Sequence, residues 1–178
     1  MRAIILVLAL SATAFAGNVK SWVLEGNDYE LGLDQSVVHG GRASAHLKSL
    51  VPQPRETALL QFIAADAYRG KRVRIAGWLR TDGLQMAAVG ARVETADAGH
   101  MFAYGRDEVV GSRGWTRREV VLDVNPEAQR IAFGAGVWGP GEAWIDDFTI
   151  EVVDKSVPTT DKLPRLPEAP TNLDFEAP

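Results

Sequence analysis

The chain has 178 residues, of which 46% are hydrophobic and 24% charged, and its formal net charge is −4. This balance argues against a disordered chain, and the acidic net charge gives no support for nucleic-acid binding, which usually needs a basic face. Cysteine is absent, so the fold does not rely on disulfides, and a chain of this length can hold one hydrophobic core without them. We therefore expect a single globular domain.

Residues 1–16 have the features of a secretion signal. Met1-Arg2 gives a positive start, residues 3–10 are apolar, and Ala14-Phe15-Ala16 is the small-x-small pattern that a signal peptidase accepts before Gly17. The apolar run is too short to span about 30 Å of hydrocarbon. We expect cleavage between Ala16 and Gly17, no membrane anchor, and a secreted or periplasmic protein.

Short alternating segments fill most of residues 17–156, the expected domain. In 72–81, Val73, Ile75 and Leu79 share one face and Trp78 lies on the other, which is typical of a half-buried strand. Similar alternation predicts strands over 86–94, 118–124, 130–138 and 144–152, with earlier strands at 21–24, 29–33, 43–49 and 58–64. One helical turn is expected at 64–69. Gly- and Pro-rich turns separate the strands, so the pattern predicts an all-β sandwich or barrel.

The composition changes after residue 156. Residues 157–170 contain four prolines and no apolar period, which predicts an extended, poorly packed linker. Residues 171–178 then carry Leu173 and Phe175 in an alternating pattern. This C-terminal segment is either a frayed end or a short docked strand.

Several short motifs follow one another along the chain. They are Asp34-x-x-Val-Val-His-Gly-Gly-Arg-x-Ser44, Tyr68-Arg-Gly-Lys-Arg-Val-Arg-Ile-x-Gly-Trp-Leu-Arg80, Gly114-Trp115 and Gly139-x-Gly-x-x-Trp-Ile-Asp-Asp147. Over residues 20–153 this order resembles the jelly-roll carbohydrate-binding modules of the family 4/9 type, which are galactose-binding-like β-sandwiches. The resemblance implies a two-sheet antiparallel jelly-roll sandwich and a carbohydrate or other glycan ligand.

One feature of those modules is displaced. Their opening Asn-x-x-Phe-Glu strand is missing after the signal segment, and a similar string, Asn172-Leu-Asp-Phe-Glu176, closes the chain instead. Either the first strand has moved to the C-terminus, or the tail begins a truncated second module.

Motifs for catalysis are missing from the sequence. It contains no glycine-rich phosphate loop, no Gly-x-Ser-x-Gly elbow and no His-Glu-x-x-His. His39, His46 and His100 lack metal-ligand spacing. Asp146 and Asp147 are adjacent on a strand, so they point to opposite faces and cannot form the facing pair of a glycoside hydrolase. We predict a protein that is not an enzyme, with a glycoside hydrolase as the least favoured reading.

Asp146 is the clearest chemical clue. If Trp144, Phe148 and Ile150 face the core, alternation turns Asp146 inward as well, where an unpaired carboxylate is costly. The resemblance implies a structural calcium ion at the sandwich edge, and Ca²⁺ takes six to eight oxygen ligands. The matching positions are Asp34, the carbonyls of Gly40 and Gly41, Asp146, and Glu176 if the tail docks. The alternative is an Asp146 held by backbone amides or by an arginine.

The faces opposite the expected core combine small residues with tryptophans and charged groups. Sugar rings stack on aromatic side chains, and their hydroxyls bond to Arg and Glu. The expected ligand-binding residues are Trp78, Arg80, Arg92, Tyr104, Glu119 and Trp138, with Tyr104 in a loop after Gly99. A loop covering Trp78, or a Trp138 that plugs one end of the core, would contradict this role.

Trp22, Trp115 and Trp144 are assigned to the core. The resulting prediction is a secreted, non-catalytic module that binds a glycan. The alternative is an envelope structural or protein-interaction module of the same fold, with a protein partner in place of a sugar.

Overall fold

The computed structural model describes residues 19–161 together with 169 and 173. The predicted signal segment and Glu176 lie outside the described residues, as does nearly all of the C-terminal segment. Leu173, the described residue of that segment, is exposed. Within this part of the chain there is no helix, and hence no helical segment that could cross a membrane.

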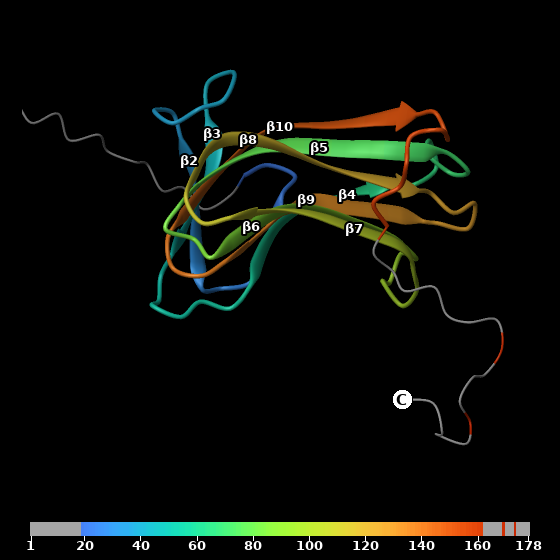
Figure 1. Ribbon diagram of the computed structural model, residues 1–178, viewed down its shortest axis with the longest axis horizontal. Coiled ribbons are helices and arrows are strands. Elements are labelled where there is room, and N and C mark those ends of the chain that lie inside the picture. The colour runs from blue at the N-terminus through green and yellow to red at the C-terminus, as the bar shows by residue number, and fades with distance from the viewer. Residues whose placement is uncertain (1–18, 162–168, 170–172, 174–178) are drawn as a thin grey trace, which may run out of the picture.

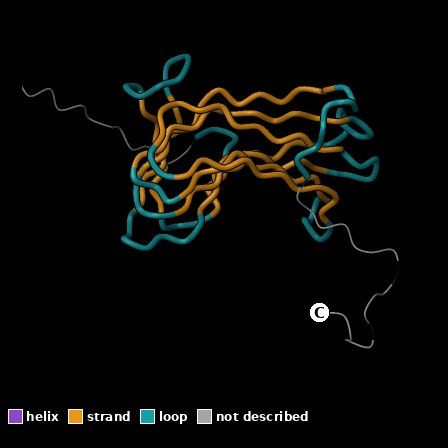
Figure 2. The backbone as a smooth tube through the Cα atoms, in the orientation of Figure 1, coloured by secondary structure: helices purple, strands orange, loops and turns teal. Residues whose placement is uncertain are grey.

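The described residues form ten strands joined by loops that gather at the two ends of the molecule (Figure 2). The strands are β1 (Val23–Glu25), β2 (Tyr29–Asp34), β3 (Ser44–Ser49), β4 (Thr57–Ala64), β5 (Arg72–Asp82), β6 (Met86–Glu94), β7 (Met101–Val110), β8 (Arg113–Asp123), β9 (Arg130–Trp138) and β10 (Glu142–Val153).

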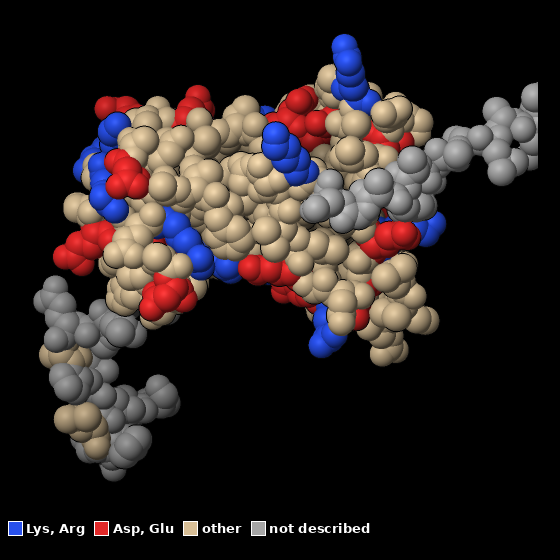
Figure 3. Space-filling view, turned by 180° about the vertical axis from the view of Figure 1, so that it is seen from behind, with Lys and Arg blue, Asp and Glu red and all other residues tan. Residues whose placement is uncertain are grey.

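The strands pair into two antiparallel sheets of five, stacked face to face (Figure 1). Sheet A has the order β1-β4-β9-β6-β7, and sheet B has the order β2-β3-β10-β5-β8. The all-β, two-sheet antiparallel sandwich expected from the sequence is confirmed. Seen from behind, charged side chains gather toward the two ends and uncharged ones cover the middle (Figure 3).

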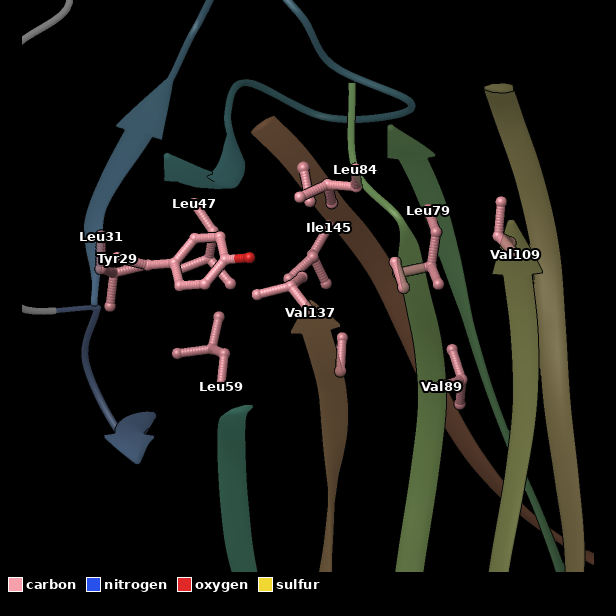
Figure 4. Packing of buried hydrophobic residues seen from close by; sticks show 13 residues of the cluster. Tyr29, Leu31, Leu47, Leu59, Leu79, Leu84, Val89, Val109, Val137 and Ile145 are labelled. Atoms are coloured by element: carbon pink, nitrogen blue, oxygen red, sulfur yellow. The ribbon is translucent and has the colours of Figure 1, made fainter. Parts of the chain in front are cut away.

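The core lies between the sheets. One cluster of buried side chains is centred on Leu47, Leu59 and Leu79, and Figure 4 shows these side chains converging from both sheets. A second cluster includes Ile75 and Ile131. Each fully buried Leu or Ile contributes about 1.5–3 kcal/mol, so two such clusters account for a fold without disulfides.

A β-bulge in β10 overturns the prediction that Asp146 points inward. The pairing of β10 with β5 shifts between Asp146 and Thr149, so Ile145 and Phe148 both face the core. Trp144 and Asp146 therefore lie on the outer face of sheet B. A bulge adds one residue to a strand and so reverses the alternation beyond it.

Two of the three tryptophans assigned to the core are elsewhere. Trp22 does pack between the sheets, against Phe133 and Phe148. Trp144 lies on the outer face of sheet B, stacked on His46, although it is buried there. Trp115 approaches the ring of His39 at one edge of that sheet.

Of two further segments, one differs from expectation and one agrees with it. Residues 101–110 form strand β7 where a loop was expected around Tyr104. The segment at 64–69 makes the expected helical turn, since the Tyr68 and Arg69 amides both donate to the Ala65 carbonyl.

The beginning of the proline-rich linker is docked, whereas an unpacked segment was expected. The Thr160 amide donates to the Val121 carbonyl at 2.8 Å, and the Val121 amide donates to Thr160 Oγ1 at 2.8 Å. The Tyr104 amide donates to Asp161 Oδ1 at 3.1 Å, and Asp161 forms a bridge to Gly105. Residues 160 and 161 thus join the edge of β8 in one sheet to the edge of β7 in the other.

Candidate functional site

The outer face of sheet A carries a regular grid of side chains. Its members alternate with core residues such as Leu59, Val89 and Ala135, and therefore point away from the core. The cross-strand rows, from one end of the face to the other, are Trp138, Met86 and Val110; Ala58, Gly136, Ala88 and Glu108; Leu60, Gly134, Gly90 and Arg106; and Phe62, Ala132, Arg92 and Tyr104.

Glycine and alanine hold the middle of this grid, which creates a groove of about 120 Å³. That volume is below the roughly 300–1,000 Å³ of pockets that enclose a drug-sized ligand, so the groove is shallow. Six residues separate the first and last rows on a strand, which corresponds to about 20 Å at about 3.4 Å per residue. The groove is therefore suited to an extended ligand. The groove itself is lined by the rows from Ala58 to Arg92, and Trp138, Met86 and Val110 continue the same face beyond it. We call this whole surface, from Trp138 to Arg92, the sheet A groove.

Gly134 and Gly90 face each other across β9 and β6 in the groove floor, and only one of them is required to be glycine by the packing of the strands. A Cβ on Gly134 would lie 1.9 Å from the Leu59 carbonyl oxygen, so the close approach of β4 and β9 requires glycine there. A Cβ on Gly90 would meet its nearest atom, the Gly105 carbonyl oxygen, at an ordinary 3.6 Å. The fold thus has room for a side chain at position 90, and its absence leaves the groove open.

Polar side chains flank the floor on two sides, from β7 and from the residue before β4. Tyr104 and Arg106 lie on β7, and Glu56, just before β4, contacts Arg106 at 3.1 Å. Arg106 also lies 3.3 Å from Glu108 and donates to Met86 Sδ at 3.4 Å. These contacts hold the guanidinium in place over the groove.

A buried carboxylate fixes the far end of the groove. Glu94 is 1% exposed, and its two oxygens face Arg130 Nε at 2.8 Å and Arg92 Nε at 3.2 Å. Arg92 is also 3.8 Å from Glu25 on β1, and Arg130 lies over the ring of Phe62. Because a buried charge needs compensation, this network locks both arginines in position.

The opposite end is apolar. Trp138 is 48% exposed and Val110 is 64% exposed, and both pair with Met86 between them. An indole this exposed at the end of a groove is available for stacking against a ring. The alternative prediction, in which Trp138 plugs one end of the core, is wrong.

The six residues predicted to bind ligand are divided between two opposite surfaces. Arg92, Tyr104 and Trp138 lie together along the sheet A groove, whereas Trp78, Arg80 and Glu119 lie on the outer face of sheet B. The His39 ring stacks on Trp78 with 3.9 Å between the ring centroids. The loop that carries His39 therefore covers Trp78, which is the alternative that the sequence analysis named against a binding role for Trp78. Arg80 lies over the Trp144 ring, and Glu119 pairs with Arg74 and Arg117.

The sequence analysis did not predict a role in the site for Glu56, Glu94 or Arg106. The spacing of Arg92 and Glu94, two apart on a predicted strand, places both on one face and could have indicated an ion pair. Nothing comparable marks Glu56, because it precedes its strand and meets Arg106 only through the fold.

The residues predicted to hold calcium are engaged differently. Asp146 Oδ2 accepts the amides of His39 at 2.9 Å and Gly40 at 3.1 Å, and its Oδ1 accepts the Asp147 amide at 2.8 Å. The loop therefore directs its N–H donors at this carboxylate. Such donors stabilise the negative charge themselves and occupy the positions where a cation would bind the oxygens. This is the backbone-amide alternative considered for Asp146, and the arrangement does not fit calcium.

Asp34 is also satisfied by protein donors. Its Oδ1 accepts Ser36 Oγ and the Ser36 and Val37 amides, and its Oδ2 accepts Trp144 Nε1 at 2.8 Å. Burial raises the pKa of the Asp34 carboxyl, but these hydrogen bonds outweigh it and lower the pKa to about 2. Among the described residues no group of three or more His, Asp or Glu side chains is placed to hold a metal ion.

The three histidines have structural surroundings in this part of the chain. His39 Nδ1 lies 2.7 Å from Asp147 Oδ2, and His46 Nε2 lies 2.9 Å from Glu142 Oε2. His100 makes an edge contact with Phe102. Gly40 passes so close to Asp147 that a Cβ there would lie 2.5 Å from its Oδ2. The His-Gly-Gly and Asp-Asp motifs thus fasten the 35–43 loop to β10.

Comparison with known proteins gives one relative in sequence. The chain is 36% identical over 168 residues to a protein of Bacillus subtilis (strain 168) named as an uncharacterized HTH-type transcriptional regulator, YbfP. The match covers 89% of this chain and 57% of the relative, so the chain spans little more than half the relative's length. No protein-family profile matches the chain.

Several solved structures share the fold. The C-terminal family 22 carbohydrate-binding module of Clostridium thermocellum Xyn10B aligns with a TM-score of 0.57 and 14% identity over 78% of this chain and 89% of that one. The module TmCBM61, in complex with β-1,4-galactotriose, gives 0.54 and 17% over 77% and 92%. The enzymatically active domain of tailspike protein 4 from bacteriophage CBA120 gives a TM-score of 0.63 and 17% identity over 77% of this chain and 20% of that one.

At these identities the similarity shows the fold alone. The fold is that of β-sandwich carbohydrate-binding modules, as the sequence resemblance implied. The carbohydrate-binding modules among these neighbours are named for families 22 and 61, so the more specific resemblance to family 4/9 is not confirmed.

Proposed function

We propose that this protein is a non-catalytic module that binds a glycan along the sheet A groove. The observation that carries the proposal is the floor of glycine and alanine on β4, β9 and β6, with Tyr104 and Arg92 at one end and Trp138 at the other. A flat floor admits sugar rings, and the flanking residues offer stacking surfaces and hydrogen bonds.

The solved neighbours support this choice of ligand class. Two of them are named for xylan binding and one was solved with a galactotriose, and all three align with this chain over more than three quarters of its length. The described residues also contain no facing pair of free carboxylates in the groove, because Glu25, Glu56, Glu94 and Glu108 are all paired with arginine. A binding role therefore fits the groove better than hydrolysis does.

The proposed place of action is outside the cytoplasm. The secretion-signal pattern of residues 1–16 supports export with cleavage before Gly17. Intact-mass analysis of protein from the native host tests this, since a mass that retains residues 1–16 would contradict export.

A substitution at Gly90 tests the binding site directly. Gly90→Leu fills the groove at a position where an added Cβ makes only ordinary contacts, so we expect at least a tenfold loss of affinity with a melting temperature no lower than that of wild type. The matched control is Gly114→Ala, because a Cβ at Gly114 meets nothing within 4 Å and lies on sheet B. Titration calorimetry against xylan, galactan, β-glucan and peptidoglycan fragments supplies the readout. Equal affinity of wild type and Gly90→Leu would place the site elsewhere.

A second candidate role is ligand sensing. The Bacillus relative is named as a helix-turn-helix regulator, yet the described residues of this chain contain no helix. A helix-turn-helix needs helices, so the part shared with the relative is not its DNA-binding part. A glycan-responsive module in such a regulator would keep the same groove, and Gly90→Leu would then abolish the response to the ligand.

A further inference from the structure

We infer that the sheet A groove selects neutral glycans over acidic ones, because every arginine that faces it is already paired with a carboxylate. This inference rests on the proposed function and adds the charge class of the ligand. It also identifies Glu56 and Glu108 as specificity-determining residues.

Arg106 is the cation closest to the middle of the groove. Glu56 lies 3.1 Å from its Nη1 and Glu108 lies 3.3 Å from its Nε, so carboxylates flank the guanidinium on both sides. The Arg106 side chain is 18% exposed, whereas Glu56 and Glu108 are 56% and 42% exposed. A ligand therefore meets the carboxylates before it meets the cation.

The other arginines are no more available. Arg92 lies between Glu94 and Glu25, and Arg130 is bound to the same buried Glu94. Recognition of a sugar carboxylate by arginine normally uses two parallel N–H bonds from one free edge of the guanidinium. In this groove each guanidinium already faces protein carboxylates, and Nε of Arg92 and of Arg106 lies in an ion pair without a hydrogen bond.

The balance of charge has a direct consequence for binding. The ion pairs of this face join three arginines to four glutamates, so an added carboxylate enters an environment without spare positive charge. Like charges brought together across an interface repel each other, whereas a neutral hydroxyl can donate to the glutamates and accept from the arginines. The groove thus attracts neutral sugars and repels uronic acids.

Removal of the two exposed charges should reverse this selectivity. In the double variant Glu56→Gln/Glu108→Gln, the side-chain volumes stay nearly constant and Arg106 loses both ion-pair partners. A freed guanidinium can then bind a sugar carboxylate in the forked geometry. The buried Glu94 is left unchanged, because its loss would disturb the fold as well as the ligand.

The experiment compares matched sugars that differ in charge. The probes are xylotetraose against xylotriose carrying a glucuronic acid, and the methyl ester of tetragalacturonate against tetragalacturonate itself, titrated by calorimetry. For wild type we expect the neutral member of at least one pair to bind, with its acidic counterpart at least about tenfold weaker, which is about 1.4 kcal/mol. In the double variant the acidic member should gain affinity, and the ratio of acidic to neutral affinity should rise at least about tenfold. The control is Glu30→Gln/Glu127→Gln, which removes two negative charges outside the groove.

The outcomes separate this inference from the proposed function. Acidic sugars that bind wild type as well as neutral ones do, or an acidic affinity that is the same in the double variant, would overturn the neutral selectivity while leaving glycan binding intact. Failure of every sugar, neutral and acidic, to bind would overturn the proposed function and the inference with it. A gain in acidic affinity in the control variant would show a general effect of net charge and would also overturn it.

Discussion

The two facing glycines of the groove floor give a sharp test of the fold. Gly134 and Gly90 are direct cross-strand partners on β9 and β6. The Gly134→Ala Cβ would lie 1.9 Å from the Leu59 carbonyl oxygen and 3.0 Å from the Leu60 Cα, so β4 and β9 must separate by more than an ångström to admit it. Gly90→Ala adds the same methyl group into the open groove.

The two substitutions should therefore differ in sign. Separation of β4 from β9 weakens a ladder hydrogen bond, worth about 1 kcal/mol, and adds an overpacking cost of about 1–3 kcal/mol. We expect Gly134→Ala to lower the free energy of unfolding by about 2–4 kcal/mol. Gly90→Ala should raise it by about 0.5–1 kcal/mol, because alanine loses less backbone entropy than glycine in a strand.

Urea denaturation of the two variants and the wild type measures both values. The m-value should stay constant, which would show that the unfolded surface is unchanged. A Gly134→Ala protein within about 1 kcal/mol of wild type would refute the steric reasoning. Equal losses for the two variants would show that both glycines serve the fold, and the case for Gly90 as a feature of the groove would fail.

Three further outcomes are expected. Acid should remove about 2 kcal/mol of stability through Asp34, because folding lowers the pKa of its carboxyl from 3.8 to about 2. This contribution is fully present above about pH 4 and disappears as the pH falls through about 2. Asp34→Asn should therefore flatten the acid part of a plot of melting temperature against pH. Asp146→Asn should cost about 1–3 kcal/mol of stability in any buffer, since a carboxylate oxygen that accepts backbone amides is replaced by an NH₂ donor. The calcium prediction instead requires that millimolar calcium raise the melting temperature of wild type and that Asp146→Asn lose most of this increase. Equal wild-type melting curves in chelator and in calcium would reject the calcium prediction. Deletion of residues 171–178 should cost about 1–3 kcal/mol if that segment docks as a strand, and a truncated protein that melts like the full chain would show that it does not.

The regular strands could be predicted from the sequence because their two faces differ in polarity. Segments such as 72–81 and 130–138 place their branched aliphatic side chains on one face only, and both are strands close to the expected bounds. Strand β7 was missed because its inward positions are small or polar. Ala103, Gly105 and Val109 face the core with Asp107 between them, so the alternation is too weak to distinguish a strand from a loop.

The bulge in β10 had no signal of its own. The sequence from Trp144 to Ile150 reads as an unbroken alternation, and only the pairing with β5 shows that two residues are accommodated where one was expected. Asp147 there has a φ of 49°, a conformation that non-glycine residues seldom adopt. A single such residue reverses the faces of all residues before it, which is why both Trp144 and Asp146 were assigned to the wrong side.

The choice between the two outer faces depends on contacts that lie far apart in the sequence. Both faces carry tryptophan and arginine, so composition cannot distinguish them. On sheet B these side chains hold the 35–43 loop and one another: His39 covers Trp78, and Asp146 accepts the loop amides. On sheet A the central rows are glycine and alanine, and the nearest large side chains stand at the margins. A face whose aromatic groups are covered by its own loop has little surface left for a ligand, whereas a face of small residues with an exposed Trp138 at its end has the space and the stacking surface that a sugar needs.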